Sequence, residues 1–311
     1  MKIYAPDYYK DFRCIADKCR HSCCIGWEID IDEDTYVYYA SIDGDFGKRL
    51  KDNIHSVDGI PCFKLGENEH CPFLNKDNLC DIILTLGSES LCQICDDHPR
   101  YRNYYSSRTE VGLGLCCEEA ARLILTRDKK AVIIQIDEND EIAIDDEQEQ
   151  MFFRMRDKMI DALQDRTLPI EQRIRRLLDI TDTDMPHIST AGLADIYLQL
   201  ERLDDSWTSM LHKLKFSDIS TTDSLMMPDT IAEQLLVYMI YRHTADGLYD
   251  STVADRVQFV ILSCYMIFAV ASACNKGDMQ TLLDVARMYS AEIEYSDENI
   301  EKLLTVLKNA S

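Results

Sequence analysis

The chain has 311 residues, of which 46% are hydrophobic, which is enough to build cores in one large domain or two ordinary ones. Its formal charge of −23 argues against a nucleic-acid-binding protein, because a phosphate backbone requires a basic face. The same charge would suit a basic partner such as a lysine-bearing protein surface, but charge alone is better explained by the solubility that acidity gives a cytosolic protein. No Walker A sequence and no GxGxxG turn between a strand and a helix occurs, so a doubly wound nucleotide-binding domain is not expected.

The cysteines are concentrated in the N-terminal third. Eleven of the 13 lie between Cys14 and Cys117. The opening residues MKIYAPDYYKDF contain no apolar run, so we expect no secretory signal and a cytoplasmic location. Thiols stay reduced there, and clustered thiols then indicate metal or redox chemistry rather than a disulfide framework. The uneven distribution predicts two domains, a cysteine-rich domain at residues 1–146 and a second at residues 147–311.

Residues 1–125 are expected to be mostly irregular, with short helices at Thr35–Ala40 and Glu118–Leu125. Acidic residues at the start of the second helix complement its dipole. The segment KKAVIIQIDENDEIAI, residues 129–144, has two apolar runs separated by a polar turn. This pattern predicts a β-hairpin.

From Glu147 onward the pattern becomes helical, with apolar residues at three- and four-residue spacing. The predicted helices lie within residues 147–166 and 169–180, and at Ser189–Lys215, Pro228–Tyr249, Thr252–Asn275, Asp278–Glu294 and Asp297–Lys308. Ser296 or Asp297 would cap the last of them. The expected fold class is mainly α: an irregular cysteine-rich metal-binding N-terminal domain with a small β-hairpin, followed by an all-α helical domain.

One stretch resembles a membrane span. Val257–Cys274 contains 18 residues without a charge, which meets the lower limit for a transmembrane helix. Arg256 and Lys276 bracket it without an orienting excess of positive charge. A helix that is apolar all round also occurs at the centre of helical domains. We therefore expect a buried core helix and no membrane partner.

The first cysteine group reads Cys14-x4-Cys19-x3-Cys23-Cys24 and is followed by Gly26, which eases a tight turn. A disulfide between the neighbours Cys23 and Cys24 would be strained, so ligation of metal is the easier role. The second group is spread out, and distant ligands would tie separate loops to one centre. Metal binding would then supply folding energy to a region poor in regular structure. This second group contains Cys71, Cys80, Cys92-x2-Cys95 and Cys116–Cys117.

Several residues keep two interpretations. Spacing alone leaves Cys92 and Cys116 open between ligand and structural roles. A mixed Cys/His zinc site also stays open, because three histidines lie near cysteines. The remaining thiols are interpreted as small buried apolar residues. The histidines are His21, His70 and His98, and the buried thiols are Cys62, Cys264 and Cys274.

Four segments resemble the flagellin lysine-N-methylases, whose N-terminal part belongs to a wider class of zinc- or iron-chelating cysteine-cluster proteins. The helical remainder resembles that family only in general character. The matching segments are CRHSCCIGWEIDID (Cys19–Asp32), CPFLNKDNLCDI (Cys71–Ile82), CDDHPR (Cys95–Arg100) and CCEEAARLIL (Cys116–Leu125).

The resemblance implies an enzyme that methylates lysine ε-amino groups on flagellin, with S-adenosylmethionine as donor. It also implies a cysteine-ligated iron–sulfur cluster, [4Fe–4S] being favoured and zinc the alternative. Cys62, Cys92 and Cys116 have no counterpart among the family cysteines. His98 lies where the family usually has an aromatic residue. The cysteines that match the family, and that we expect to bind metal, are Cys14, Cys19, Cys23, Cys24, Cys71, Cys80, Cys95 and Cys117.

Two other classes of function compete with the methyltransferase. One is a zinc-stabilised protein-binding module without catalysis, and the other is an iron–sulfur redox or electron-transfer protein. No sequence pattern marks a catalytic base or a donor-binding residue. The donor could bind beside the cluster or between the domains.

Overall fold

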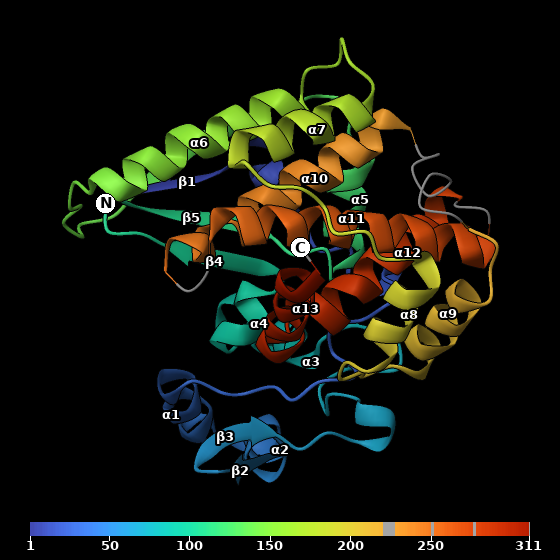
Figure 1. Cartoon of the computed structure of the whole chain (residues 1–311). Coiled ribbons are helices and arrows are strands. Elements are labelled where there is room, and N and C mark those ends of the chain that lie inside the picture. The colour runs from blue at the N-terminus through green and yellow to red at the C-terminus, as the bar shows by residue number, and fades with distance from the viewer. Residues whose placement is uncertain (220–227, 250–251, 276–277, 311) are drawn as a thin grey trace. The chain divides into compact units, whose positions relative to one another are not determined.

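The computed structural model describes residues 1–219, 228–249, 252–275 and 278–310, and most of them are helical (Figure 1). By its internal contacts the chain forms two compact units. We call Met1–Phe12, Arg102–Cys116 and Ala120–Ser311 the helical unit, and Arg13–Tyr101 with Cys117–Glu119 the cysteine unit. The boundary expected between residues 146 and 147 lies inside the helical unit. A mainly α fold is thus confirmed.

A four-stranded sheet has the order β4-β5-β1-β6, with β1 parallel to β5 and antiparallel to β6. In Figure 1, α6 runs along β1 and β5. Arg156 of α6 forms a buried ion pair of 2.6 Å with Glu110 of β5. The strands are β1 Lys2–Pro6, β4 Arg100–Tyr104, β5 Arg108–Leu113 and β6 Ile133–Glu138, and α6 spans Glu147–Leu163.

The hairpin predicted at residues 129–144 is wrong. Only its first apolar run forms a strand, β6, and that strand pairs with β1 at the start of the chain. The second run stays outside the sheet, and Ile142 and Ile144 remain 86% and 63% exposed. A strand needs a partner strand for its backbone hydrogen bonds, and only the first run pairs with one, β1. The hairpin that does form lies earlier, in the cysteine unit.

The helices of the C-terminal half follow the predicted segments, with breaks that the sequence analysis did not place. The segment Ser189–Lys215 contains two helices, because Asp204 caps a new start by accepting from the Ser206 N–H at 2.7 Å. Ser296 accepts from the Asn299 N–H at 3.3 Å, as expected for the cap of the last helix. The helices are α5 Glu118–Leu125, α7 Ile170–Thr181, α8 Thr190–Leu198, α9 Asp205–Lys215, α10 Asp229–His243, α11 Val253–Asn275, α12 Met279–Tyr289, a π-helix at Ser290–Glu294, and α13 Asp297–Ala310.

Helix α11 contains the uncharged stretch. Among the described residues it is the one helix long and apolar enough to cross a membrane, and 78% of its most apolar window is buried in the structure. It packs against α7, α9, α10, α12 and α13. This burial is the environment that a core helix requires.

The cysteine unit has four short α-helices, three 3-10 turns and one hairpin. Asp32 caps α1 by accepting from the Thr35 N–H at 3.0 Å. The hairpin strands are joined by Asp58 and Gly59, both with positive φ, which suits a two-residue turn. The elements are α1 Glu33–Ser41, α2 Gly44–Asp52, β2 Ile54–Val57, β3 Ile60–Phe63, α3 Asp81–Leu86 and α4 Gln93–Asp97.

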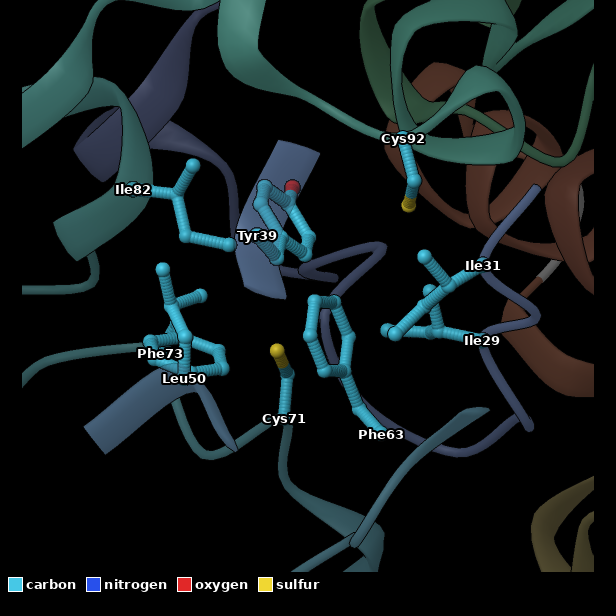
Figure 2. Packing of buried hydrophobic residues seen from close by; sticks show 9 residues of the cluster. All are labelled: Ile29, Ile31, Tyr39, Leu50, Phe63, Cys71, Phe73, Ile82 and Cys92. Atoms are coloured by element: carbon cyan, nitrogen blue, oxygen red, sulfur yellow. The ribbon is translucent and has the colours of Figure 1, made fainter. Parts of the chain in front are cut away.

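This unit has its own apolar core, shown in Figure 2. Phe63 and Phe73 meet with their ring centroids 5.0 Å apart, and the Cys71 side chain points in among the apolar side chains. The buried members are Ile29, Ile31, Tyr39, Leu50, Phe63, Cys71, Phe73, Ile82 and Cys92.

Candidate metal centre

Half of the predicted ligands gather at the apolar core of the cysteine unit. Cys71 is part of that core, and Cys24, Cys80 and Cys95 pack against it. Burial, with a smaller contribution from the charges of Cys24 and Cys80, raises the pKa of Cys71 to about 12. The hydrogen bond with Cys92 and burial raise the pKa of Cys95, and the charges of Cys24 and Cys71 add to this effect. These four residues form what we call the inner group.

The loop from Cys71 to Cys80 is closed by its own backbone. The Cys71 N–H donates to the Cys24 carbonyl at 2.8 Å, which joins this loop to the first cysteine segment. The Asn75 side chain accepts from the Leu79 N–H at 3.1 Å, and a β-bridge pairs Leu74 with Cys80. Asparagine is well suited to such a turn because its side chain replaces a backbone acceptor. The motif CPFLNKDNLC thus places its two cysteines on one side of a tight loop.

Arg49 braces the same loop. Its guanidinium donates to the Asp81 carboxylate and to the Pro72 carbonyl, both at 2.7 Å. It also lies over the Phe73 ring, 5.0 Å from the centroid. One side chain therefore fixes both ends of the loop that supplies Cys71 and Cys80.

Cys92 lies with the inner group, although its spacing alone left its role open. It precedes α4, and its carbonyl accepts from the Cys95 N–H at 3.0 Å. A hydrogen bond from the Cys95 thiol lowers the pKa of Cys92. Asp32 holds the start of α4 by accepting from the Gln93 N–H at 2.8 Å. Cys92 is thus a fifth thiol beside the inner four.

The other four predicted ligands form what we call the outer group: Cys14, Cys19, Cys23 and Cys117. They are exposed or half-buried. The hydrogen bond with Cys24 raises the pKa of Cys23, and the charges of Cys14 and Cys117 add to the effect. Burial raises the pKa of Cys19, and the charges of Glu118 and Cys14 add to this effect.

An ion pair brings Cys117 to this group. The Glu118 carboxylate accepts from the Arg20 side chain and from the Arg20 N–H, both at 2.9 Å. The Cys19 thiol lies 3.8 Å from the same carboxylate. These contacts hold Cys117 beside a loop almost a hundred residues earlier in the chain.

The adjacent residues Cys23 and Cys24 belong to different groups. The hydrogen bond from Cys23 lowers the pKa of Cys24 to about 7. The Trp27 indole donates to the Cys23 carbonyl at 2.5 Å, and Gly26 turns the chain with a φ of +90°. The peptide bond between Cys23 and Cys24 therefore joins the outer group to the inner group.

The sulfur spacing bears on the kind of metal. A tetrahedral zinc site with Zn–S bonds of about 2.3 Å holds its sulfurs about 3.8 Å apart. In the described residues, no three cysteine sulfurs all lie within 4.8 Å of one another. All 13 cysteines are free thiols, so they are available as ligands of a zinc or iron centre.

The remaining cysteines and histidines occupy other places. Cys116 is in the helical unit, where burial raises its pKa and Tyr295 hydrogen-bonds to it. Cys264 and Cys274 lie on α11, as buried and half-buried thiols. Burial lowers the pKa of His98 to about 4, and its ring lies 6.0 Å from that of Trp27. His98 thus packs near the Trp27 ring, as an aromatic residue would.

An open cavity of about 390 Å³ lies beside the α4 cysteines. Three carboxylates line it, those of Asp32, Glu89 and Asp96. Burial would raise the pKa of Asp32, but the N–H groups of Gln93 and Thr35 outweigh this effect and lower it. The cavity can therefore attract cations.

A buried polar network in the helical unit was not predicted from the sequence. Glu294 accepts from Tyr238 and pairs with His243, both at 2.8 Å, and Arg242 lies 3.3 Å away. Burial would raise the pKa of Glu294, but Arg242 and His243 hold it at about 2. The sequence feature that could have indicated this network is the Arg242-His243 pair at the end of an apolar helix.

Residues 187–311 match the model of the FliB lysine N-methylase C-terminal domain. The chain is 31% identical over 134 residues to the flagellar biosynthetic protein FliU of Salmonella muenchen, covering 40% of this chain and 78% of FliU. The lysine-N-methylases of Salmonella typhimurium and Salmonella choleraesuis show the same identity over 33% of their length. No solved structure matches significantly.

The chain belongs to the FliB and FliU lysine N-methylase family. The likeness to this family also reaches the C-terminal helices, which the sequence analysis placed in the family only by general character. The matched stretch spans a third of the relatives that are named lysine-N-methylase.

Proposed function

We propose that the chain is a protein-lysine N-methyltransferase that acts on flagellin, with S-adenosylmethionine as donor and a cysteine-ligated iron–sulfur centre. The names of its family and relatives support the activity. The observation that supports the metal centre is the placement of all eight predicted ligands in one compact unit, with the inner group and Cys92 at its apolar core and the outer group at exposed or half-buried positions.

The inner group would hold a [4Fe–4S] cluster, because four thiolates are the usual ligand set of such a cluster. When bound, the cluster supplies iron sites in an apolar surrounding. The apolar packing of Cys71 and Cys80 limits access of water to these ligands. The outer group, which is more exposed, would hold a second metal centre.

The chain must favour the neutral form of the lysine amine. At neutral pH the amine is almost fully protonated, its reference pKa being ~10.4, and the ammonium has no lone pair. Methyl transfer forms a bond between the amine nitrogen and the methyl carbon, breaks the bond between that carbon and the sulfonium sulfur, and releases one proton. A site of low polarity lowers the amine pKa and so increases the reactive form.

The acidic cavity beside α4 suits binding rather than deprotonation. Lysine and S-adenosylmethionine both carry a positive charge, and Asp32, Glu89 and Asp96 would attract either of them. Carboxylates close to an ammonium stabilise its charged form, so they cannot by themselves activate it. Asp96→Asn and Glu89→Gln are therefore expected to raise KM more than they lower kcat.

We place the donor beside the inner group. Donor titrated into the anaerobic protein should then shift the electron paramagnetic resonance spectrum of the reduced cluster. A spectrum that stays unchanged at saturating donor would contradict this placement. Donor binding and methyl transfer that persist in metal-free, folded protein would also contradict it.

The activity is tested with labelled S-adenosylmethionine and purified flagellin, using anaerobic protein whose iron, sulfide and zinc have been measured. We expect label on flagellin lysines, and loss of that transfer in Cys24→Ser and Cys71→Ser. Cys274→Ser, on α11, is the matched control and should keep full activity. Zinc without iron and no transfer would instead identify a zinc-stabilised binding module. Iron and sulfide without transfer would identify a redox protein.

A further inference from the structure

A third set of potential metal ligands contains no member of either cysteine group. Ligand atoms of Glu28, His55 and Cys62 all lie within 4.8 Å of one another. The Cys62 sulfur is 3.4 Å from a Glu28 oxygen. Among the described residues this is the one set of three or more such atoms that meets this spacing.

The hairpin explains why His55 and Cys62 meet. The turn at Asp58 and Gly59 fixes the register of β2 and β3, and in that register His55 is opposite Cys62. Residues opposite each other in an antiparallel pair share one face, with Cβ atoms about 5 Å apart. The Asp-Gly turn therefore sets this pair.

The other edge of β3 brings in Glu28. The Ile31 N–H donates to the Pro61 carbonyl at 2.8 Å, and a β-bridge pairs Asp30 with Cys62. Because side chains alternate along an extended chain, Glu28 and Asp30 share the face of Cys62. The intervening residues point the other way, and Ile29, Ile31 and Phe63 lie in the core. The core thus fixes which side chains form the polar face.

We propose that Glu28, His55 and Cys62 bind one Zn²⁺ ion, separate from the metal of the cysteine groups. A thiolate, an imidazole and a carboxylate are all zinc ligands, and three protein ligands leave one position for water. The carboxylate of Asp30, on the same face, adds negative charge near the ion. On binding, the Cys62 thiol loses its proton to solvent and forms the sulfur–zinc bond.

The spacing separates this set from the cysteine groups. The three atoms are already as close as ligands of a single ion must be, whereas the sulfurs of the cysteine groups are not. Glu28 and His55 are exposed, so they can adjust to an ion, while Cys62 is buried beneath them. Zinc would then tie residues 28–30 to the hairpin.

The test uses full-length anaerobic protein with its iron and sulfide already measured. One equivalent of Zn²⁺ is added, and bound zinc is measured against a chelator of known affinity. We expect one zinc per chain, and a Kd that rises at least about 100-fold in His55→Ala, because even partners outside the ligand shell are worth 10- to 100-fold. His187→Ala, which removes an exposed histidine of the helical unit, is the control.

X-ray absorption at the zinc edge identifies the ligands. One sulfur at about 2.3 Å with nitrogen and oxygen at about 2.0–2.2 Å would support the site. Four sulfurs would place the zinc in a cysteine group and overturn the proposal, as would zinc binding that His55→Ala and Cys62→Ser leave unchanged. Iron content and methyl transfer are measured on the same samples. A failure of the methyltransferase proposal can therefore be distinguished from a failure of the zinc-site proposal.

Discussion

Arg20 and Glu118 form an ion pair of 2.9 Å that fixes the place of Cys117. Glu118 is the first residue of α5, where a carboxylate also complements the helix dipole. The pair joins two segments that each carry cysteines of the outer group. A surface ion pair contributes little to stability by itself, so its importance here is positional.

Glu118→Ala is therefore expected to lower the metal content while leaving the helical content unchanged. Cys117 loses a neighbouring contact that helps to hold it beside Cys19, which weakens the outer group. Iron, sulfide and zinc per chain provide the measurement. The control is Glu147→Ala, which removes an exposed glutamate from the first position of α6. Equal metal content in both variants would show that the ion pair does not position a ligand.

Substitution of the adjacent cysteines one at a time should separate the two groups. If the groups hold separate centres, Cys23→Ser and Cys24→Ser will each remove part of the metal, and the double variant will remove more than either. Cys24→Ser should also make residues 13–101 sensitive to protease, because the inner group lies at the core of that unit. Cys274→Ser should change neither metal content nor proteolysis.

Two other results of these substitutions would contradict separate centres. If either single substitution removes all of the metal, the eight cysteines form one interdependent centre. Unchanged metal content and unchanged proteolysis in the double variant would rule out a metal centre at these residues.

An aspartate at Ile267 should destabilise the helical unit by several kcal/mol, since an unpaired charge would be buried in α11. Urea unfolding monitored by circular dichroism measures the loss. Asn309→Asp adds the same charge at an exposed position of α13 and should have little effect. Stable partition of the unaltered protein into membranes would contradict the assignment of α11 as a core helix.

Acid should weaken the helical unit through Glu294. The pKa of this carboxyl is held at about 2 in the folded protein, so its contribution to stability is full above its unfolded pKa and is lost as the pH falls toward 2. The difference in unfolding free energy between the unaltered protein and Glu294→Gln should shrink by about 2 kcal/mol between pH 6 and pH 3. Urea unfolding at several pH values measures it. A difference that does not depend on pH would show that Glu294 does not titrate with folding.

The sequence by itself determined the helical class and the concentration of thiols. Apolar spacing predicted most helices of the C-terminal half, because a helix is selected by local periodicity. The segments Thr35–Ala40 and Glu118–Leu125 lie in α1 and α5 as predicted. The family likeness could be seen in short motifs such as CPFLNKDNLC, and the comparisons confirmed the family.

Tertiary structure decided which residues meet. Strand β6 pairs with β1 from the other end of the sequence, and no local pattern specifies a partner so distant. The place of Cys117 beside the loop of Cys19 and Cys23 depends on the Arg20–Glu118 pair. Cys62, which the sequence presented as an isolated apolar thiol, faces Glu28 and His55 because β3 pairs on both of its edges. Spacing along a chain limits local geometry, whereas a binding site depends on contacts between distant segments, which only the folded chain makes.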